Sequence, residues 1–380
     1  MNDKQNDLAL VMSGGGARAA YQVGFLLGIA HHRKEIRFPI ITGVSAGAIN
    51  AAYLANESGS FLARIDKLAE VWSALTIDHV FRVDTPSIVK HAGGWALRLL
   101  MGRASKQVKI RAMVDTDPLR MFLEGILHSQ EGRLSGIQTS IDSGELKGIA
   151  LTASSYSTGQ SITWVQGENV KHWERAHRKS VMSDIRVEHI MASASLPLFF
   201  PAIRVGKEWY GDGGIRLTAP LSPAIHLGAK RILAISTRYL PSVEEQGMEM
   251  IDDYPPPAQV VGAMFNAIFL DVFDNDALRL ERINTLINYT TEKHDHELEP
   301  VKLLLLRPSQ NLGKMANQFE PNLPRTFRFM TRGLGTKETR SNDLLSMVMF
   351  QHDYISELMD LGYRDAEARM DEVVEFFDSD

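Results

Sequence analysis

Residues Leu8–Ala19 read LALVMSGGGARA: a short apolar run, a break of three glycines and the start of a helical pattern. The run Leu8–Met12 is bounded by turn residues, which is typical of a buried parallel strand. Over Ala17–His32 the apolar residues recur at helical spacing. A second strand is expected over Phe38–Thr42 and a second helix over Ala46–Ala55, with a glycine between them. This repeated order of strand, glycine turn and helix predicts an α/β fold with a parallel sheet.

The rest of the chain adds strands and long helical stretches. Further strands are predicted at Gly148–Ser154, Ser161–Val165, Arg231–Ser236 and Val301–Leu306. Residues of about 60–145 read as a helical insertion, and a long helix is expected over about 258–289, after three consecutive prolines. We therefore expect one α/β domain over residues 1–310 and a C-terminal helical extension over residues 311–380.

The composition excludes several classes of protein. The 380 residues include 46 acidic and 41 basic side chains, a net charge of −5, whereas a nucleic-acid-binding protein usually has a basic excess. The absence of cysteine excludes a disulfide scaffold, a thiolate nucleophile and a cysteine-ligated metal. No metal-ligand spacing of the H-E-x-x-H or EF-hand kind occurs, so we expect neither a metal nor a cofactor.

Two segments bear on location. Met1–Asp7 is polar and lacks the basic, apolar and cleavage-site regions of a secretory signal. The uncharged run Phe38–Asn56 is long enough to span a membrane, but Pro39, Gly43 and Gly47 interrupt it, and we interpret it as core. We therefore expect a cytoplasmic protein.

The motif Gly43-Val44-Ser45-Ala46-Gly47 lies between the second predicted strand and its helix. In a nucleophile elbow, a G-x-S-x-G turn exposes the serine hydroxyl above the sheet, and its glycines leave room for the neighbouring chain. The helix that follows directs its first amides toward developing negative charge. The alternative is a small-residue turn that only lets a helix pack on the sheet, but the strand–turn–helix context favours a nucleophile at Ser45.

A second glycine-rich turn, Gly14–Ala19, follows the first strand and opens the first helix. Consecutive glycines can direct their amides together into an anion-binding concavity. The turn also matches the dinucleotide fingerprint G-x-G-x-x-G/A, but that fold needs an acidic residue at the end of the next strand, where Ile41-Thr42-Gly43 stands. An oxyanion hole beside Ser45 fits better, and a helix start without a ligand is the remaining alternative.

The third pattern is Asp212 within the glycine-rich segment Tyr210–Gly214. Taken alone, such an aspartate is most often a structural Asx-turn. A catalytic role for Asp212 is favoured here because Ser45 needs a proton acceptor. Of the 12 histidines, His226 is the best candidate for a triad, but we interpret it as a helical residue rather than a base.

Together these patterns resemble the patatin-like phospholipases. The resemblance is carried by Gly14–Arg18, Gly43–Gly47 and Asp212–Gly214 in that order, with Ala192–Pro197 and Phe200-Pro201 as the loop before the aspartate. It extends from Leu8 to about Leu306. The resemblance implies a three-layer α/β/α sandwich with a mainly parallel central sheet, a Ser–Asp dyad without histidine, and hydrolysis of lipid acyl esters.

Carried over by position, the resemblance makes Ser45 the nucleophile and Asp212 the general base. The glycine loop and its basic residue would form and fix the oxyanion hole: Gly14, Gly15, Gly16 and Arg18. The glycines of the elbow and of the aspartate loop are Gly43, Gly47, Gly213 and Gly214. This chain departs from the family pattern in having Ala19 for a frequent glycine and Thr218 for an asparagine near the aspartate.

The protonation state of the base is a separate expectation. With an ordinary pKa of about 3.9, Asp212 would be ionised at neutral pH. Turnover should then show no limb near about pH 6.5 that follows a histidine.

Residues of about 88–111 are basic and apolar and contain no acidic residue. Such a segment could contact an anionic membrane surface, so that the protein would be peripheral to it. A cap that covers the core is the favoured alternative, because the segment lacks a clean helical moment.

The expected partner is a lipid or another acyl ester, and not a nucleic acid. Two other functions stay open: a catalytically silent lipid-binding or regulatory module of the same fold, and a nucleotide-binding oxidoreductase.

Overall fold

The computed structural model describes residues 6–82, 112–246, 254–289, 299–333 and 341–378. Within them ten strands form one sheet in the order β10-β9-β1-β2-β3-β4-β6-β5, with β8 paired to β3 and β7 to β8. Five neighbouring strands are parallel: β10 (Lys302–Leu306), β9 (Arg231–Ile235), β1 (Leu8–Met12), β2 (Ile40–Val44) and β3 (Gly148–Ser155). The predicted α/β fold with a mainly parallel sheet is confirmed, although β2 begins and ends two residues later than the sequence indicates.

The remaining strands form the antiparallel part of the sheet and its edge. They are β4 (Ser161–Gly167), β5 (Glu174–Arg175), β6 (Arg178–Met182), β7 (Ile203–Val205) and β8 (Glu208–Asp212). Of these the sequence predicts only β4. β8 matters most for the site, because Asp212 pairs with Ala153 while the preceding residue of β3, Thr152, pairs with Val44 of β2. The ends of β2 and β8 therefore meet.

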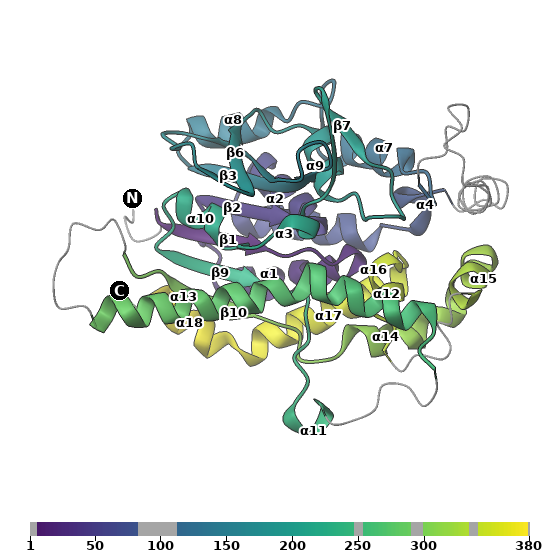
Figure 1. Ribbon diagram of the computed structural model, residues 1–380. Coiled ribbons are helices and arrows are strands. Elements are labelled where there is room, and N and C mark those ends of the chain that lie inside the picture. The colour runs from purple at the N-terminus through teal and green to yellow at the C-terminus, as the bar shows by residue number, and fades with distance from the viewer. Residues whose placement is uncertain (1–5, 83–111, 247–253, 290–298, 334–340, 379–380) are drawn as a thin grey trace.

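Helices cover both faces of the sheet (Figure 1). Leu8, Leu10 and Met12 of β1 share a core with α1 (Ala20–His32), α2 (Ala46–Asn56), α3 (Phe61–Ser73) and α17 (His352–Ala368). The alternate residues Ala9 and Val11 pack with α10 (Ser222–His226) and α13 (Asp271–Tyr289) on the other face. Because successive side chains of a strand point to opposite faces, this division gives three layers, as the resemblance implied.

The predicted insertion is helical where it is described, with α4 (Ile77–Val80), α7 (Asp117–Ile126) and α8 (Ser135–Asp142) after α3. α7 begins at Asp117 and has Pro118 in its first turn, where proline is well tolerated. The long helix expected over about 258–289 is interrupted. It consists of α12 (Pro257–Phe265), a π-helical turn (Asn266–Leu270) and α13. A π-turn is often associated with a functional site, and this one adds Phe269 and Leu270 to a small apolar cluster that also contains residues near the C-terminus.

The C-terminal residues pack into the same core as the sheet. They form α14 (Leu312–Phe319), α15 (Arg325–Gly333), α16 (Asp343–Val348), α17 and α18 (Met370–Asp378). α17 lies along α1, where the buried hydroxyl of Tyr21 donates to Asp365 at 2.9 Å. The remaining α-helices in the described ranges are α9 (Val187–Ser193) and α11 (Val243–Gln246). No helix in the described ranges is both long and apolar enough to cross a membrane.

Candidate active site

Ser45 occupies a sharp turn between β2 and α2. Its backbone angles are φ 56° and ψ −131°, a positive φ that a non-glycine residue adopts only under strain. The turn also needs a glycine two residues later, because a Cβ on Gly47 would lie 2.4 Å from the carbonyl oxygens of Met12 and Ser13. Gly43, at the other end of the motif, faces the backbone of Gly47 equally closely. The G-x-S-x-G motif therefore has the strand–turn–helix geometry predicted for it.

Asp212 meets Ser45 at the end of β8. The Ser45 hydroxyl donates to Asp212 Oδ2 at 2.5 Å, and the backbone N–H of Gly214 donates to Asp212 Oδ1 at 2.9 Å. The N–H of Asp212 itself donates to the carbonyl of Ser195 at 3.0 Å. Gly213 packs its Cα against Thr152, where a Cβ would lie 2.1 Å from the carbonyl oxygen. A short charge-assisted bond of this kind can pass the proton of a serine to a carboxylate.

No histidine in the described part of the chain bonds to this pair. His226 instead stacks flat on Trp173, with ring centroids 4.5 Å apart and an angle of 11° between the rings. Burial, followed by the charges of Arg178 and Arg175, lowers the pKa of His226. The interpretation of His226 as a helical residue of α10 agrees with these contacts.

The ordinary pKa expected for Asp212 is wrong. The side chain is fully buried, and burial raises the pKa of Asp212 to about 7, although the hydrogen bonds from Ser45 and Gly214 act in the opposite direction. Desolvation outweighs the bonds because a buried carboxylate loses the hydration that stabilises its charge. At neutral pH the group is therefore poised between its protonated and ionised forms, as suits a general base.

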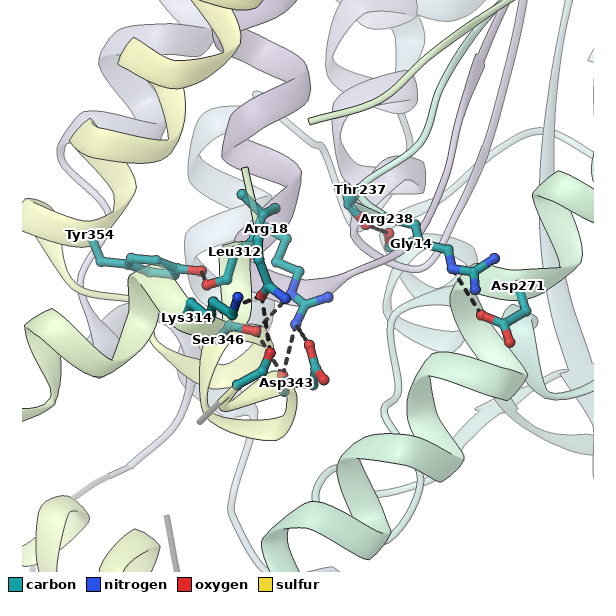
Figure 2. Close-up of polar contacts among 12 residues, drawn as sticks. Gly14, Arg18, Thr237, Arg238, Asp271, Leu312, Lys314, Asp343, Ser346 and Tyr354 are labelled. Atoms are coloured by element: carbon teal, nitrogen blue, oxygen red, sulfur yellow. Dashed lines mark hydrogen bonds and ion pairs between the residues drawn. The ribbon is translucent and has the colours of Figure 1, made fainter. Parts of the chain in front are cut away.

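The glycine loop lies against Ser45. A Cβ on Gly14 would lie 2.8 Å from Ser45 Cβ, and Gly15 and Gly16 have positive φ angles of 145° and 59°. The Thr237 hydroxyl donates to the Gly14 carbonyl at 2.7 Å (Figure 2). Among the described residues, no acceptor takes up the N–H of Gly15 or of Gly16. These amides are available to an anion beside Ser45.

Arg18 makes its bonds to the C-terminal part of the chain (Figure 2). Its side chain is only 3% exposed and donates to Ser346 Oγ and to Asp343 Oδ1, both at 2.6 Å. The resemblance implies that Arg18 fixes the glycine loop, and these bonds are compatible with that role.

Ser193 is a site residue that sequence reasoning missed. It ends α9, and its hydroxyl accepts the N–H of Ser45 at 2.9 Å and donates to the Thr152 carbonyl at 2.6 Å. It thereby ties the strained elbow to β3. The only signal was its place in the small-residue segment that precedes the aspartate.

Ser45 also lines an apolar pocket, whose empty space, open solvent included, is about 690 Å³. Its walls come from α3, α7, the loop after α9 and α16. They include Leu68, Trp72, Leu123, Ile126, Phe200 and Met347. A nucleophile at the side of an apolar pocket suits a substrate with a hydrocarbon chain.

Two further predictions concern groups outside this arrangement. No cluster of His, Asp and Glu able to hold a metal occurs in the ranges that the structure describes. The segment 88–111, considered for membrane contact, lies outside the described residues.

The chain matches one protein family and is distantly similar to several solved structures. A family model described as patatin-like phospholipase matches residues 10–225. No curated protein sequence matches the chain.

Among solved structures, human GIVD cytosolic phospholipase A2 is 11% identical with a TM-score of 0.49, and the match covers 99% of this chain and 60% of that one. VipD from Legionella pneumophila is 14% identical with a TM-score of 0.35, over 93% of this chain and 67% of that one. The chain thus spans well under two thirds of the length of the human protein. Because the family model matches more than half of its residues, the chain belongs to the patatin-like phospholipase family.

Proposed function

We propose that the protein is a serine hydrolase of lipid acyl esters, with Ser45 as nucleophile and Asp212 as general base. The observation that carries the proposal is the 2.5 Å bond from Ser45 Oγ to Asp212 Oδ2 at the wall of an apolar pocket. Membership of a family described as phospholipases supports an acyl ester of a lipid as the substrate class.

In the first half of the reaction, Ser45 Oγ attacks the carbonyl carbon of the ester and gives its proton to Asp212. The N–H groups of Gly15 and Gly16 meet the oxyanion that forms on the carbonyl oxygen. When the tetrahedral intermediate collapses, the bond to the alcohol breaks and the alcohol takes the proton from Asp212. The acyl group is then an ester of Ser45.

In the second half, water gives a proton to Asp212 and attacks the acyl-serine ester. Ser45 leaves and recovers its proton, and the fatty acid departs. Asp212 must be ionised at the start of each half. The pKa of about 7 keeps an appreciable fraction of it ionised at neutral pH while making it a stronger base than an ordinary aspartate.

The acyl chain is the part of the substrate that the pocket would hold. Each methylene moved from water to an apolar wall contributes about 0.8 kcal/mol, so a long chain supplies binding energy without any polar contact. The pocket offers no charged side chain among its described walls, so a head group has no partner inside it.

The alternative functions have less support. A silent lipid-binding module would not need the strained Ser45 turn or the buried carboxylate bonded to it. A nucleotide-binding oxidoreductase would use Gly14–Gly16 for a pyrophosphate, but a Cβ at Gly14 would already lie 2.8 Å from Ser45. Location in the cytoplasm and membrane contact through residues 88–111 stay predictions.

A fluorophosphonate probe and a panel of lipid and p-nitrophenyl esters test the proposal. We expect the wild-type protein to be labelled and to hydrolyse long-chain esters, and both properties to be lost in Ser45→Ala. A wild-type protein that binds these esters but neither hydrolyses them nor reacts with the probe would be a silent module.

A further inference from the structure

α16 lies outside the residues that match the family model, yet it contacts the oxyanion loop directly. Arg18, at the end of that loop, reaches across to it. Nη2 of Arg18 donates to Asp343 Oδ1 at 2.6 Å and to the Asp343 carbonyl at 3.3 Å, and Nε donates to Ser346 Oγ at 2.6 Å (Figure 2). The two residues that meet Arg18 are more than 300 positions away in the sequence.

The backbones of the loop and of α16 also touch. A Cβ on Gly16 would lie 2.0 Å from the carbonyl oxygen of Met347, so no other residue fits at this point. Met347 lines the apolar pocket together with Gly16 and Ser45. α16 is therefore a shared wall of the loop and of the pocket.

α16 also contacts elements other than the loop. The N–H of Asn342, which precedes its first turn, donates to the Gly313 carbonyl at 3.1 Å. Within α16, Ser346 Oγ donates to the Asp343 carbonyl at 2.7 Å. Leu344 and Met347 pack against the phenylalanines of α12 and the π-turn. α16 is thus a support fixed by its own contacts rather than a segment that follows the loop.

The ion pair between Arg18 and Asp343 is almost shielded from water, with side chains 3% and 17% exposed. Removing one partner of such a pair leaves the other charge uncompensated, so the remaining side chain has to move toward water or another partner. A movement of Arg18 that displaces its own backbone also shifts the backbone two and three residues before it. Those are the amides of Gly15 and Gly16, whose distance from the oxyanion decides how well they stabilise it.

We propose that Asp343 and Ser346 are positioning residues of the hydrolase: through Arg18 they hold the Gly14–Gly16 loop where its amides meet the oxyanion. This inference rests on the proposed function. It predicts an effect on the chemical step, because the oxyanion forms only after attack, while binding of the acyl chain in the pocket is left in place.

The test compares Asp343→Asn with Glu357→Gln, a matched control that neutralises an acid in the surface pair Glu357–Arg364 of α17. Loss of one oxyanion donor costs roughly 10²–10³ in rate, so a displaced loop should lower kcat by about tenfold to a hundredfold. KM should change by less than about threefold, because ground-state binding is kept. The control should keep the wild-type kcat.

Ser346→Ala is a second variant, chosen because it removes one acceptor of Arg18 and leaves the ion pair intact. We expect a smaller fall in kcat, of about threefold to tenfold, together with a lower melting temperature, because the buried Nε–H of Arg18 loses its acceptor. Arg18→Met combined with Asp343→Asn should cost no more in kcat than Arg18→Met alone, since both changes break the same link.

The outcomes separate the inference from the function beneath it. Ester hydrolysis by the wild type that is lost in Ser45→Ala establishes the function. If Asp343→Asn and Ser346→Ala then fold and keep the wild-type kcat, or change KM alone, the positioning role is refuted and the hydrolase stands. If the wild type neither hydrolyses esters nor reacts with the probe, both proposals fall together.

Discussion

Asp212 combines two demands that oppose each other. A base must be close to Ser45 and shielded from water, and that same burial raises the pKa of Asp212 to about 7. An acid whose pKa is higher in the folded than in the unfolded chain makes the folded state less stable as pH rises from the unfolded pKa to the folded one. The folded protein therefore carries an ionisation cost at neutral pH, which in the proposed mechanism serves catalysis.

Replacing this carboxylate should separate activity from stability. Asp212→Asn keeps an acceptor for the Gly214 N–H but cannot take a proton, so turnover should fall by at least about 10²–10⁴-fold. The rise in pKa from 3.8 to about 7 corresponds to at most about 4 kcal/mol, and the variant should gain up to that amount in free energy of unfolding above pH 7. The gain should shrink between about pH 7 and pH 4 and vanish below. Denaturant titrations at pH 4 and pH 8 measure it, and equal stabilities at pH 8 would argue against the raised pKa.

The same group sets the pH dependence of turnover. Because Asp212 must be ionised to accept the serine proton, kcat/KM should rise with pH and level off above a midpoint near about 7, the raised pKa. A histidine could produce a similar midpoint, so the matched measurement is the profile of His226→Ala, which should keep both the midpoint and most of the activity. An inactive His226→Ala beside an active Asp212→Asn would replace the dyad by a conventional triad.

At the scale of elements, the pocket depends on α7 as much as on the turn that carries Ser45. Ile126, in the last turn of α7, is half-buried and lines the pocket, whereas Met121 on the same helix is 70% exposed and does not. An indole at position 126 would occupy space that methylenes of an acyl chain would fill.

Ile126→Trp should therefore change the preference for chain length. Excluding about four methylenes, at about 0.8 kcal/mol each, should lower kcat/KM for long-chain esters by roughly a hundredfold. Short esters such as acetates should change by less than about threefold, and Met121→Trp should leave the whole profile unchanged. Hydrolysis rates across p-nitrophenyl esters of increasing length give the answer. An equal loss of kcat/KM for esters of every chain length would show that the substitution in α7 disturbs Ser45 and its surroundings rather than the space for the acyl chain.

The same scale explains what could be predicted from the sequence. β1, β2 and the two glycine turns have strong local signals, namely apolar runs, glycines at close approaches and helical spacing. These signals predict that the Gly14–Gly16 turn follows β1 and the Ser45 turn follows β2, as the structure has them. β8 was missed because Glu208–Asp212 is short and has no apolar run, and its pairing with β3 joins segments more than 50 residues apart. The partners of Arg18 and the role of Ser193 also depend on contacts between distant segments, for which the local sequence has no signal.

At the scale of the whole molecule, the C-terminal helices share the core of the sheet. Tyr21 and Phe25 of α1 and Leu358 of α17 belong to one buried cluster with the strands. The sequence predicts a domain over residues 1–310 and a helical extension over residues 311–380. Because the two parts share one core, we expect them to unfold together. Two-state unfolding requires that a change in one part destabilise the other.

The distribution of tryptophan makes this cooperativity measurable. All 5 tryptophans, at positions 72, 95, 164, 173 and 209, precede residue 310, so their fluorescence reports mainly on the first part. Trp72 also responds to the C-terminal part, because it lines the pocket together with Met347. Leu358, in α17, is fully buried, and Leu358→Ala should lower the free energy of unfolding by about 2–5 kcal/mol. If the chain is one cooperative unit, the free energy of unfolding measured by fluorescence in urea falls by that full amount. The unfolding curve measured by circular dichroism then has the same midpoint. Asp360→Ala, an exposed change on the same helix, should shift neither midpoint.

A fluorescence midpoint that stays in place while helicity is lost earlier would mean that the C-terminal helices fold as a separate unit. In that case α16 could leave the oxyanion loop while the sheet stays folded, and the support it gives to Arg18 would be conditional on the extension being docked.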